Sequence, residues 1–167
     1  MMKKVVLMIL FFVIIFASCS VKSSQISSPD ENIAVSFQLS PKDGAFSYVV
    51  KFKEKTIIDT SYIGFNFKNM PSLNKGFKAV VKKPVEVNNT WQMPWGEQLN
   101  VVNNYNEVTV QLEEIADLKR KVNVIFRVYN DGVGFRYDFP EQENVREVFI
   151  TDEKTEFNLT EDYKTFW

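Results

Sequence analysis

Histidine is absent from the 167-residue chain, and cysteine occurs once, as Cys19. Without histidine the chain has no imidazole general base, no Ser-His-Asp triad and no Cys-His nucleophile. One cysteine and no histidine also exclude nearly every zinc site of the Cys/His type. The side chains left for chemistry are carboxylates, lysines, tyrosines, serines and threonines.

The chain also lacks an excess of charge of either sign. It has 20 Lys and Arg residues against 21 Asp and Glu residues, a formal net charge of −1. Nucleic-acid binding depends on Lys and Arg that neutralise phosphates, so we expect no nucleic-acid partner. Hydrophobic residues make up 45% of the chain and aromatic residues 14%, which is enough for the packed core of one domain.

The N-terminus carries an apolar run, residues 5–17, directly after Lys3 and Lys4. This run is shorter than the roughly 20 residues that a bilayer-spanning helix needs. The small residues Ala17 and Ser18 at its end favour cleavage. We therefore predict a bacterial export signal over residues 1–18, and a transmembrane anchor is the weaker interpretation.

The segment Phe16-Ala17-Ser18-Cys19 resembles a lipobox, in which the cysteine thiol is acylated and becomes the new N-terminus. An aliphatic residue is more usual where Phe16 stands, and the alternative is a plain secreted protein with an incidental cysteine. The lipobox predicts a lipid anchor on Cys19 and therefore a location in the cell envelope. Residues 19–28 are rich in serine and are expected to form a flexible tether, followed by one folded domain over residues 29–167.

Alternation of apolar and polar residues dominates the chain after Pro29, and no segment longer than ten residues shows a helical period. Many short strands separated by turn residues indicate an all-β fold, an antiparallel β-sandwich. The expected strands cover residues 33–39, 46–52, 56–58, 63–67, 77–87, 99–102, 106–112, 122–128, 133–139 and 147–151.

Two hairpin connections are predicted from local chemistry. Asn130-Asp131-Gly132 separates two expected strands, and Asp-Gly is typical of a primed turn with positive φ angles. The charged segment Lys53-Glu54-Lys55 is expected to connect an earlier pair.

Pairs of carboxylates invite comparison with the acid and nucleophile of a glycosidase. Glu113 and Glu114 are adjacent, so on a strand they point to opposite faces and cannot share a substrate. Glu141 and Glu143 can share a face, but they follow Pro140 in a polar stretch and are interpreted as solvated charges. We expect no catalytic residue in this chain.

Three sequence segments together resemble the N-terminal domain of glycoside hydrolase family 97, the periplasmic α-glucosidase and α-galactosidase group. They are residues 90–97 (TWQMPWGE), 103–107 (NNYNE) and 126–137 (FRVYNDGVGFRY). Shorter matching pieces lie at residues 28–30, 63–65, 152–153 and 155–157. The matches follow the family's order over residues 28–167.

The resemblance implies a β-sandwich similar to the galactose-mutarotase super-sandwich, packed against a (β/α)8 barrel that holds the catalytic carboxylates and a calcium site. The barrel is missing from this chain, and we expect the sandwich to be incomplete at its C-terminus. The resemblance therefore assigns no metal ligand and no cofactor here, although calcium is expected in the complete enzyme. It implies a non-catalytic, carbohydrate-binding-like or structural part of a calcium-dependent α-glycoside hydrolase that acts on oligosaccharides.

Four residues are candidates for contact with a sugar or with the missing barrel: Trp91, Trp95, Glu97 and Asn104. Flat aromatic rings accept the apolar faces of sugars, while amides and carboxylates bind hydroxyl groups. The alternatives for the two tryptophans are contact with the barrel or burial in the core of this domain. The competing function for the whole chain is an independent lipid-anchored module that binds carbohydrate or another protein.

Overall fold

The computed structural model describes residues 24–116, 118–143 and 145–164, which contain twelve strands and no helix. The strands are β1 (Ser24–Ser27), β2 (Ile33–Leu39), β3 (Phe46–Phe52), β4 (Lys55–Tyr62), β5 (Phe65–Phe67), β6 (Phe77–Val81), β7 (Val85–Gln92), β8 (Asn100–Glu114), β9 (Lys121–Tyr129), β10 (Val133–Asp138), β11 (Ile150–Glu153) and β12 (Asn158–Leu159). Within this part of the chain, no helix is available that could cross a bilayer.

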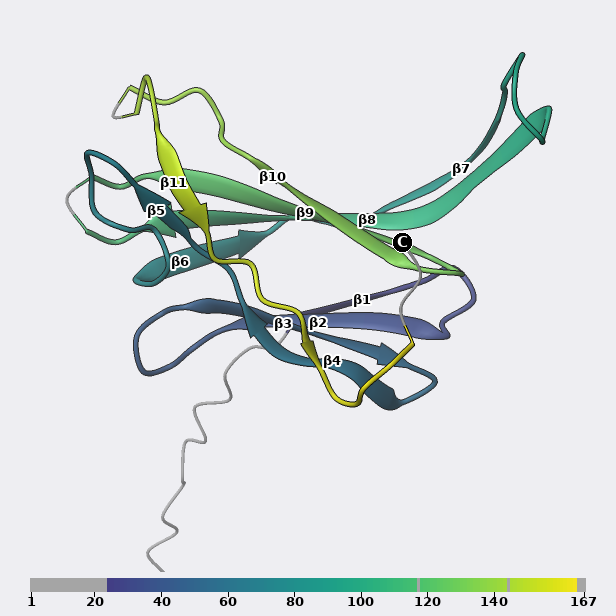
Figure 1. The fold of residues 1–167 in the computed structure, drawn as a ribbon, viewed down its shortest axis with the longest axis horizontal. Coiled ribbons are helices and arrows are strands. Elements are labelled where there is room, and N and C mark those ends of the chain that lie inside the picture. Colours follow the sequence, from purple (N-terminus) through teal and green to yellow (C-terminus); the bar gives the residue numbers. More distant parts are fainter. Residues whose placement is uncertain (1–23, 117, 144, 165–167) are drawn as a thin grey trace, which may run out of the picture.

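Two antiparallel sheets face each other and form a β-sandwich (Figure 1). The first sheet has the strand order β1-β2-β3-β4-β12, and the second has the order β10-β9-β8-β6, with β7 also paired to β8. A small third sheet pairs β11 with β5. The prediction of an antiparallel β-sandwich is confirmed.

The core lies between the two sheets, where alternate residues of each strand are buried. Phe37 of β2 stacks on Phe126 of β9, with ring centroids 5.7 Å apart and planes 3° from parallel. Valines 122, 124 and 128 of β9 are at most 1% exposed. Full burial of a large apolar side chain contributes about 1.5–3 kcal/mol, so the period-two pattern that predicted these strands also stabilises them.

The folded domain begins earlier than predicted. The expected tether extends to Ser28, but Ser24–Ser27 forms β1 and pairs with β2, with Ile26 opposite Val35. Ile26 is 5% exposed and belongs to the core. The serines of this segment are compatible with an edge strand because Ile26 supplies the inward-facing apolar side chain.

The primed turn is at a different hairpin from the one predicted. The β9–β10 hairpin exists, with Val128 opposite Val133, but neither Asp131 nor Gly132 has a positive φ. The β3–β4 hairpin has a two-residue loop in which Lys53 and Glu54 have φ angles of 47° and 65°. The three-residue loop after β9 reverses the chain without positive φ angles. A two-residue loop, such as Lys53-Glu54, needs positive φ angles to do the same.

One predicted strand is divided in two. Residues 77–87 form β6 and β7, separated at residues 82–84, and Pro84 has no N–H to donate to a ladder. Val81 lies opposite Val110, and Val85 lies opposite Glu107. The chain therefore advances four residues from β6 to β7 while β8 advances only three. This extra residue is a β-bulge, and it reverses which side chains face the core.

Candidate functional site

The most distinctive feature of the molecule is a two-stranded arm formed by residues 85–107, that is, β7, the tip and the first half of β8. Figure 1 shows the arm curving away from both sheets beyond the bulge. The backbone N–H of Met93 donates to the Leu99 carbonyl at 2.9 Å and closes the tip. Gly96 in the tip has a φ of 123°, a conformation that is essentially restricted to glycine.

Both candidate tryptophans lie on this arm and are exposed. Trp91 is 49% exposed and Trp95 is 80% exposed, and Glu97 is also exposed at the tip. The interpretation of the tryptophans as core residues of this domain is therefore wrong. Leu99 and Val102, at 60% and 69% exposed, add to the apolar surface of the arm.

The strand register separates the candidate residues. Trp91 lies opposite Val101, whereas Asn104 lies opposite Asn88. Because side chains alternate between the faces of a ribbon, Trp91 and Asn104 point to opposite sides of the arm. The structure does not bring the four candidates into one sugar site.

The face that carries Asn104 borders a polar groove at the base of the arm, which we call the amide groove. Its volume is about 550 Å³. Its lining residues come from β1, the loop after β1, β7 and β8, namely Gln25, Ile26, Ser27, Ser28, Pro29, Glu31, Pro84, Glu86, Val87, Asn88, Asn104 and Asn106. The side-chain N–H of Asn106 donates to the Ser27 carbonyl at 2.8 Å and joins the base of the arm to β1.

The opposite face of the arm begins with a cluster of aromatic and charged side chains. The guanidinium of Arg127 lies over the Tyr105 ring at 4.7 Å, and its Nε donates to Glu107 at 2.6 Å. The hydrogen bond from Arg127 to the Glu107 carboxylate raises the pKa of Arg127. The Tyr129 ring packs 4.9 Å from the Tyr105 ring. This cluster supports the arm where it leaves the sandwich, and sequence reasoning missed it because its members come from two strands.

The adjacent glutamates have different environments. Glu113 faces outward and pairs with Lys78 at 2.8 Å, whereas Glu114 is 7% exposed. Glu114 is bound by Arg120, which is 1% exposed and was not predicted to be important. The hydrogen bonds from Arg120 lower the pKa of the Glu114 carboxyl despite its burial. The predicted separation of Glu113 and Glu114 onto opposite faces is confirmed.

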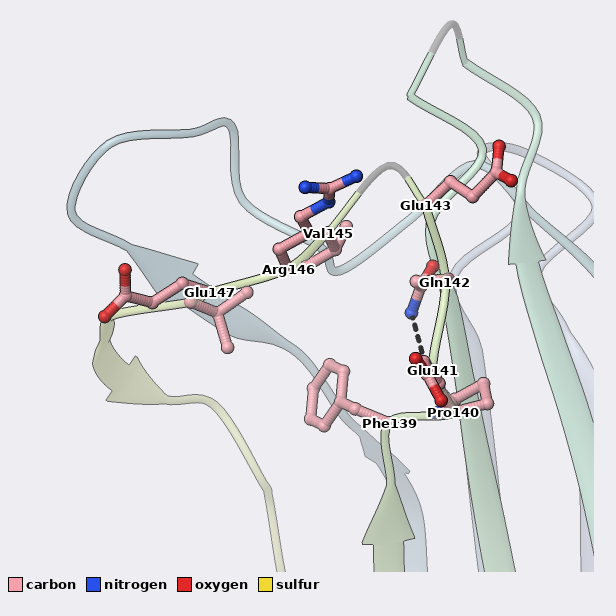
Figure 2. A pocket seen from close by; sticks show the side chains of 9 residues that line it. Phe139, Pro140, Glu141, Gln142, Glu143, Val145, Arg146 and Glu147 are labelled. Carbon is pink, nitrogen blue, oxygen red and sulfur yellow. Dashed lines mark hydrogen bonds between the residues drawn. The ribbon is translucent and has the colours of Figure 1, made fainter.

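The second carboxylate pair borders a hollow of about 700 Å³ along the loop after β10. Figure 2 shows Phe139 facing this hollow, while the carboxylates of Glu143 and Glu147 point away from it on opposite sides. Gln142 anchors the loop by donating to the carbonyls of Pro140, at 3.2 Å, and of Lys121, at 3.0 Å. The carboxylates of Glu143 and Glu147 therefore do not converge on one point as those of a glycosidase site do.

The described segments contain no group of three or more His, Cys, Asp or Glu side chains that could hold a metal ion. The residues present there do not fit a calcium site. Cys19, the predicted lipidation site, and the predicted signal peptide of residues 1–18 lie outside the described residues.

Comparison with models of known protein families identifies the family of this chain. The model of the glycosyl-hydrolase 97 N-terminal family matches residues 26–167. The chain belongs to this family. The match includes the core strands and the whole arm, so the arm is part of the N-terminal domain of glycoside hydrolase family 97.

Solved structures of glycoside-cleaving enzymes, including family 97 members, show the same fold. An enzyme from Pseudoalteromonas sp. strain K8, solved in complex with panose, is 37% identical with a TM-score of 0.76, and the match covers 82% of this chain and 20% of that one. The same enzyme in complex with acarbose gives 36% identity and the same coverage. A β-arabinopyranosidase is 27% identical with a TM-score of 0.72, over 81% of this chain and 21% of that one. The chain thus spans about a fifth of the length of these relatives.

Proposed function

We propose that this chain is the N-terminal, non-catalytic part of a calcium-dependent α-glycoside hydrolase that acts on oligosaccharides. The observation that carries the proposal is the family match over residues 26–167, in a chain that spans a fifth of its solved relatives. The relatives include enzymes solved with panose and acarbose and a β-arabinopyranosidase. The family context therefore supports glycoside hydrolysis, and the choice between α-glucoside and α-galactoside substrates depends on the catalytic domain.

In this proposal the arm is a docking element for the (β/α)8 catalytic barrel. Its apolar side chains lie on both faces and at the tip: Trp91 on one face, Val102 on the other, and Trp95 and Leu99 at the end. A sugar that stacks on one face leaves the other face exposed to water. A two-stranded ribbon is also marginally stable by itself, so a protein partner that encloses the outer half of the arm, residues 89–103, fits these apolar side chains better than a glycan does.

The calcium ion of the proposed enzyme takes its ligands outside the described part of this chain. The adjacent carboxylates Glu113 and Glu114 are already engaged, Glu113 with Lys78 and Glu114 with Arg120. The proposed contribution of this domain is to support the catalytic domain and to form one wall of the cleft.

An activity assay tests the proposal. The purified chain must retain Ser24–Ser27, because β1 belongs to the first sheet. We expect no hydrolysis of nitrophenyl α-glycosides by the chain alone, with or without calcium. Adding the separately expressed catalytic part of the Pseudoalteromonas enzyme should restore calcium-dependent turnover above that of the catalytic part alone. Turnover by the chain alone, or no effect on the catalytic part, contradicts the proposal.

The second candidate function is an independent carbohydrate-binding or protein-interaction module, favoured by the exposure of Trp91 and Trp95. Calorimetric titration with maltose and galactose oligosaccharides separates the candidates. A module that uses the tryptophans loses sugar binding in the variants Trp91→Ala and Trp95→Ala. A docking arm loses its effect on the catalytic part instead.

We further propose that the chain is exported by the signal of residues 1–18 and anchored by acylation of Cys19, in the periplasm or at the outer membrane of a Gram-negative bacterium. Labelling of expressing cells with a radioactive fatty acid should mark the wild-type protein and not the Cys19→Ser variant. Equal labelling of both contradicts the anchor, and secretion of both as soluble protein favours a plain export signal.

A further inference from the structure

We propose that the amide groove is a binding site for a neutral oligosaccharide, carried by this domain itself. The ligand class rests on the proposed glycoside-hydrolase context, while the site is built from residues of this chain alone. The groove lies on the face of the arm opposite Trp91, so the site is distinct from the exposed tryptophans.

The groove presents a compact array of polar side chains. Glu86 lies opposite Asn106 in the register, and Asn88 lies opposite Asn104. Directly opposite residues have Cβ atoms about 4.5–5.5 Å apart, and the two rows are about 7 Å apart along the strands. Three amides and a carboxylate therefore cover an area comparable with a sugar ring and its hydroxyl groups.

Two of the asparagine amides that face the groove, those of Asn88 and Asn104, are available for a ligand, whereas Asn106 already donates to the Ser27 carbonyl. On the other face of the same strands, Asn103 donates to Asn89 at 3.2 Å, so these two side chains are paired with each other. Across the described segments, the side chains of Asn88 and Asn104 make no hydrogen bond to the protein. An amide supplies both donors and an acceptor, which is what a hydroxyl-rich ligand requires.

The charge of the groove selects against anions. Glu31 and Glu86 are the charged side chains among the lining residues, and the lining contains no Lys or Arg. Phosphates, nucleic acids and acidic peptides are therefore repelled. Pro29 and Pro84 supply apolar surface for the C–H faces of a sugar. A neutral oligosaccharide combines hydroxyl groups and apolar faces in this way.

The test is an NMR titration of the purified chain with maltotetraose and, separately, with a galactose oligosaccharide. We expect saturable shifts of the Asn88 and Asn104 side-chain amides with at least one sugar. The double variant Asn88→Ala/Asn104→Ala should raise the Kd about tenfold or more, since two hydrogen bonds are lost. The matched control Asn89→Ala/Asn103→Ala, on the other face of the same strands, should leave the Kd within about twofold.

Three results overturn the inference: no saturable shifts with either sugar, an equal loss in the control variant, or shifts of the groove amides with calcium chloride alone and none with sugar. The catalytic assay distinguishes this inference from the proposed function. If the groove variant loses sugar binding but still stimulates the separate catalytic part, both proposals stand. If sugar binds and stimulation fails with the wild-type chain, the groove site stands and the role as part of the hydrolase is wrong.

Discussion

Arg120 and Glu114 form a bidentate ion pair in the interior, with Nε 2.8 Å from Oε2 and Nη2 2.7 Å from Oε1. The Arg120 guanidinium also donates to the carbonyls of Pro71, at 2.6 Å, and Ser72, at 3.1 Å. It lies 5.5 Å from the centre of the Phe67 ring. These contacts neutralise the buried charge and use four of the five N–H groups of the guanidinium. They join the end of β8 to the loop after β5.

Removal of one partner of this pair should be strongly destabilising. We expect Arg120→Ala to lower the free energy of unfolding by about 3–5 kcal/mol, because it leaves Glu114 buried without its partner. The measurement is urea denaturation followed by far-UV circular dichroism, because the tryptophans of the arm are exposed in the folded state. The control is Lys78→Ala, which breaks the exposed pair with Glu113 and should cost no more than about 1 kcal/mol. Similar losses in both variants would show that the buried pair has no special role.

The same pair predicts a dependence of stability on pH. The pKa of Glu114 is lowered in the folded state from 4.5, so the unfolded state binds the proton more tightly. The contribution of Glu114 is complete above its unfolded pKa and is lost as the pH falls through its folded pKa. Glu114→Gln should therefore reduce the decline in stability below pH 4.5 while lowering stability at neutral pH. Parallel pH profiles for wild type and variant contradict this prediction.

Glycine at the β3–β4 turn should stabilise the protein. Glu54 has a φ of 65°, which strains a residue with a side chain, so Glu54→Gly should raise the free energy of unfolding by about 1 kcal/mol. Gly132→Ala, in the hairpin that was predicted to have the primed turn, is the contrast. An added Cβ at Gly132 meets no atom within 4 Å and its φ is not positive, so the variant should change stability little. Thermal denaturation of both variants tests the assignment.

The tryptophans of the arm should matter for association and not for folding. Trp95 is 80% exposed, so Trp95→Ser should change the free energy of unfolding by no more than about 0.5 kcal/mol. It should also reduce self-association in sedimentation velocity and binding of an apolar dye, because exposed apolar surface drives both. Phe126→Ala, at a fully buried position, should cost about 3–5 kcal/mol. A large loss of stability in Trp95→Ser would place this side chain in the fold.

Much of the fold could be predicted because apolar alternation is a local property. The residues of β2 and β9 that alternate in the sequence are the ones buried between the sheets. The β9–β10 hairpin was also predictable from its turn residues, although its backbone conformation was not. β1 was not predicted because its serines resemble a linker, and only the pairing with β2 shows that Ile26 is a core residue.

By itself, the sequence determined the all-β class, the positions of most strands and the family motifs, since each depends on residues close together in the chain. The tertiary structure decided which residues share a site. The bulge at residues 82–84 sets the face of the arm on which each side chain of β7 lies. Trp91 and Asn104 therefore lie on opposite faces, whereas Asn88 and Asn104 lie on the same face. It also decided that Arg120 is buried, because the carbonyls that accept its hydrogen bonds are 48 and 49 residues away in the chain. Period-two patterns define the faces of one strand, but only long-range pairing sets the register between strands.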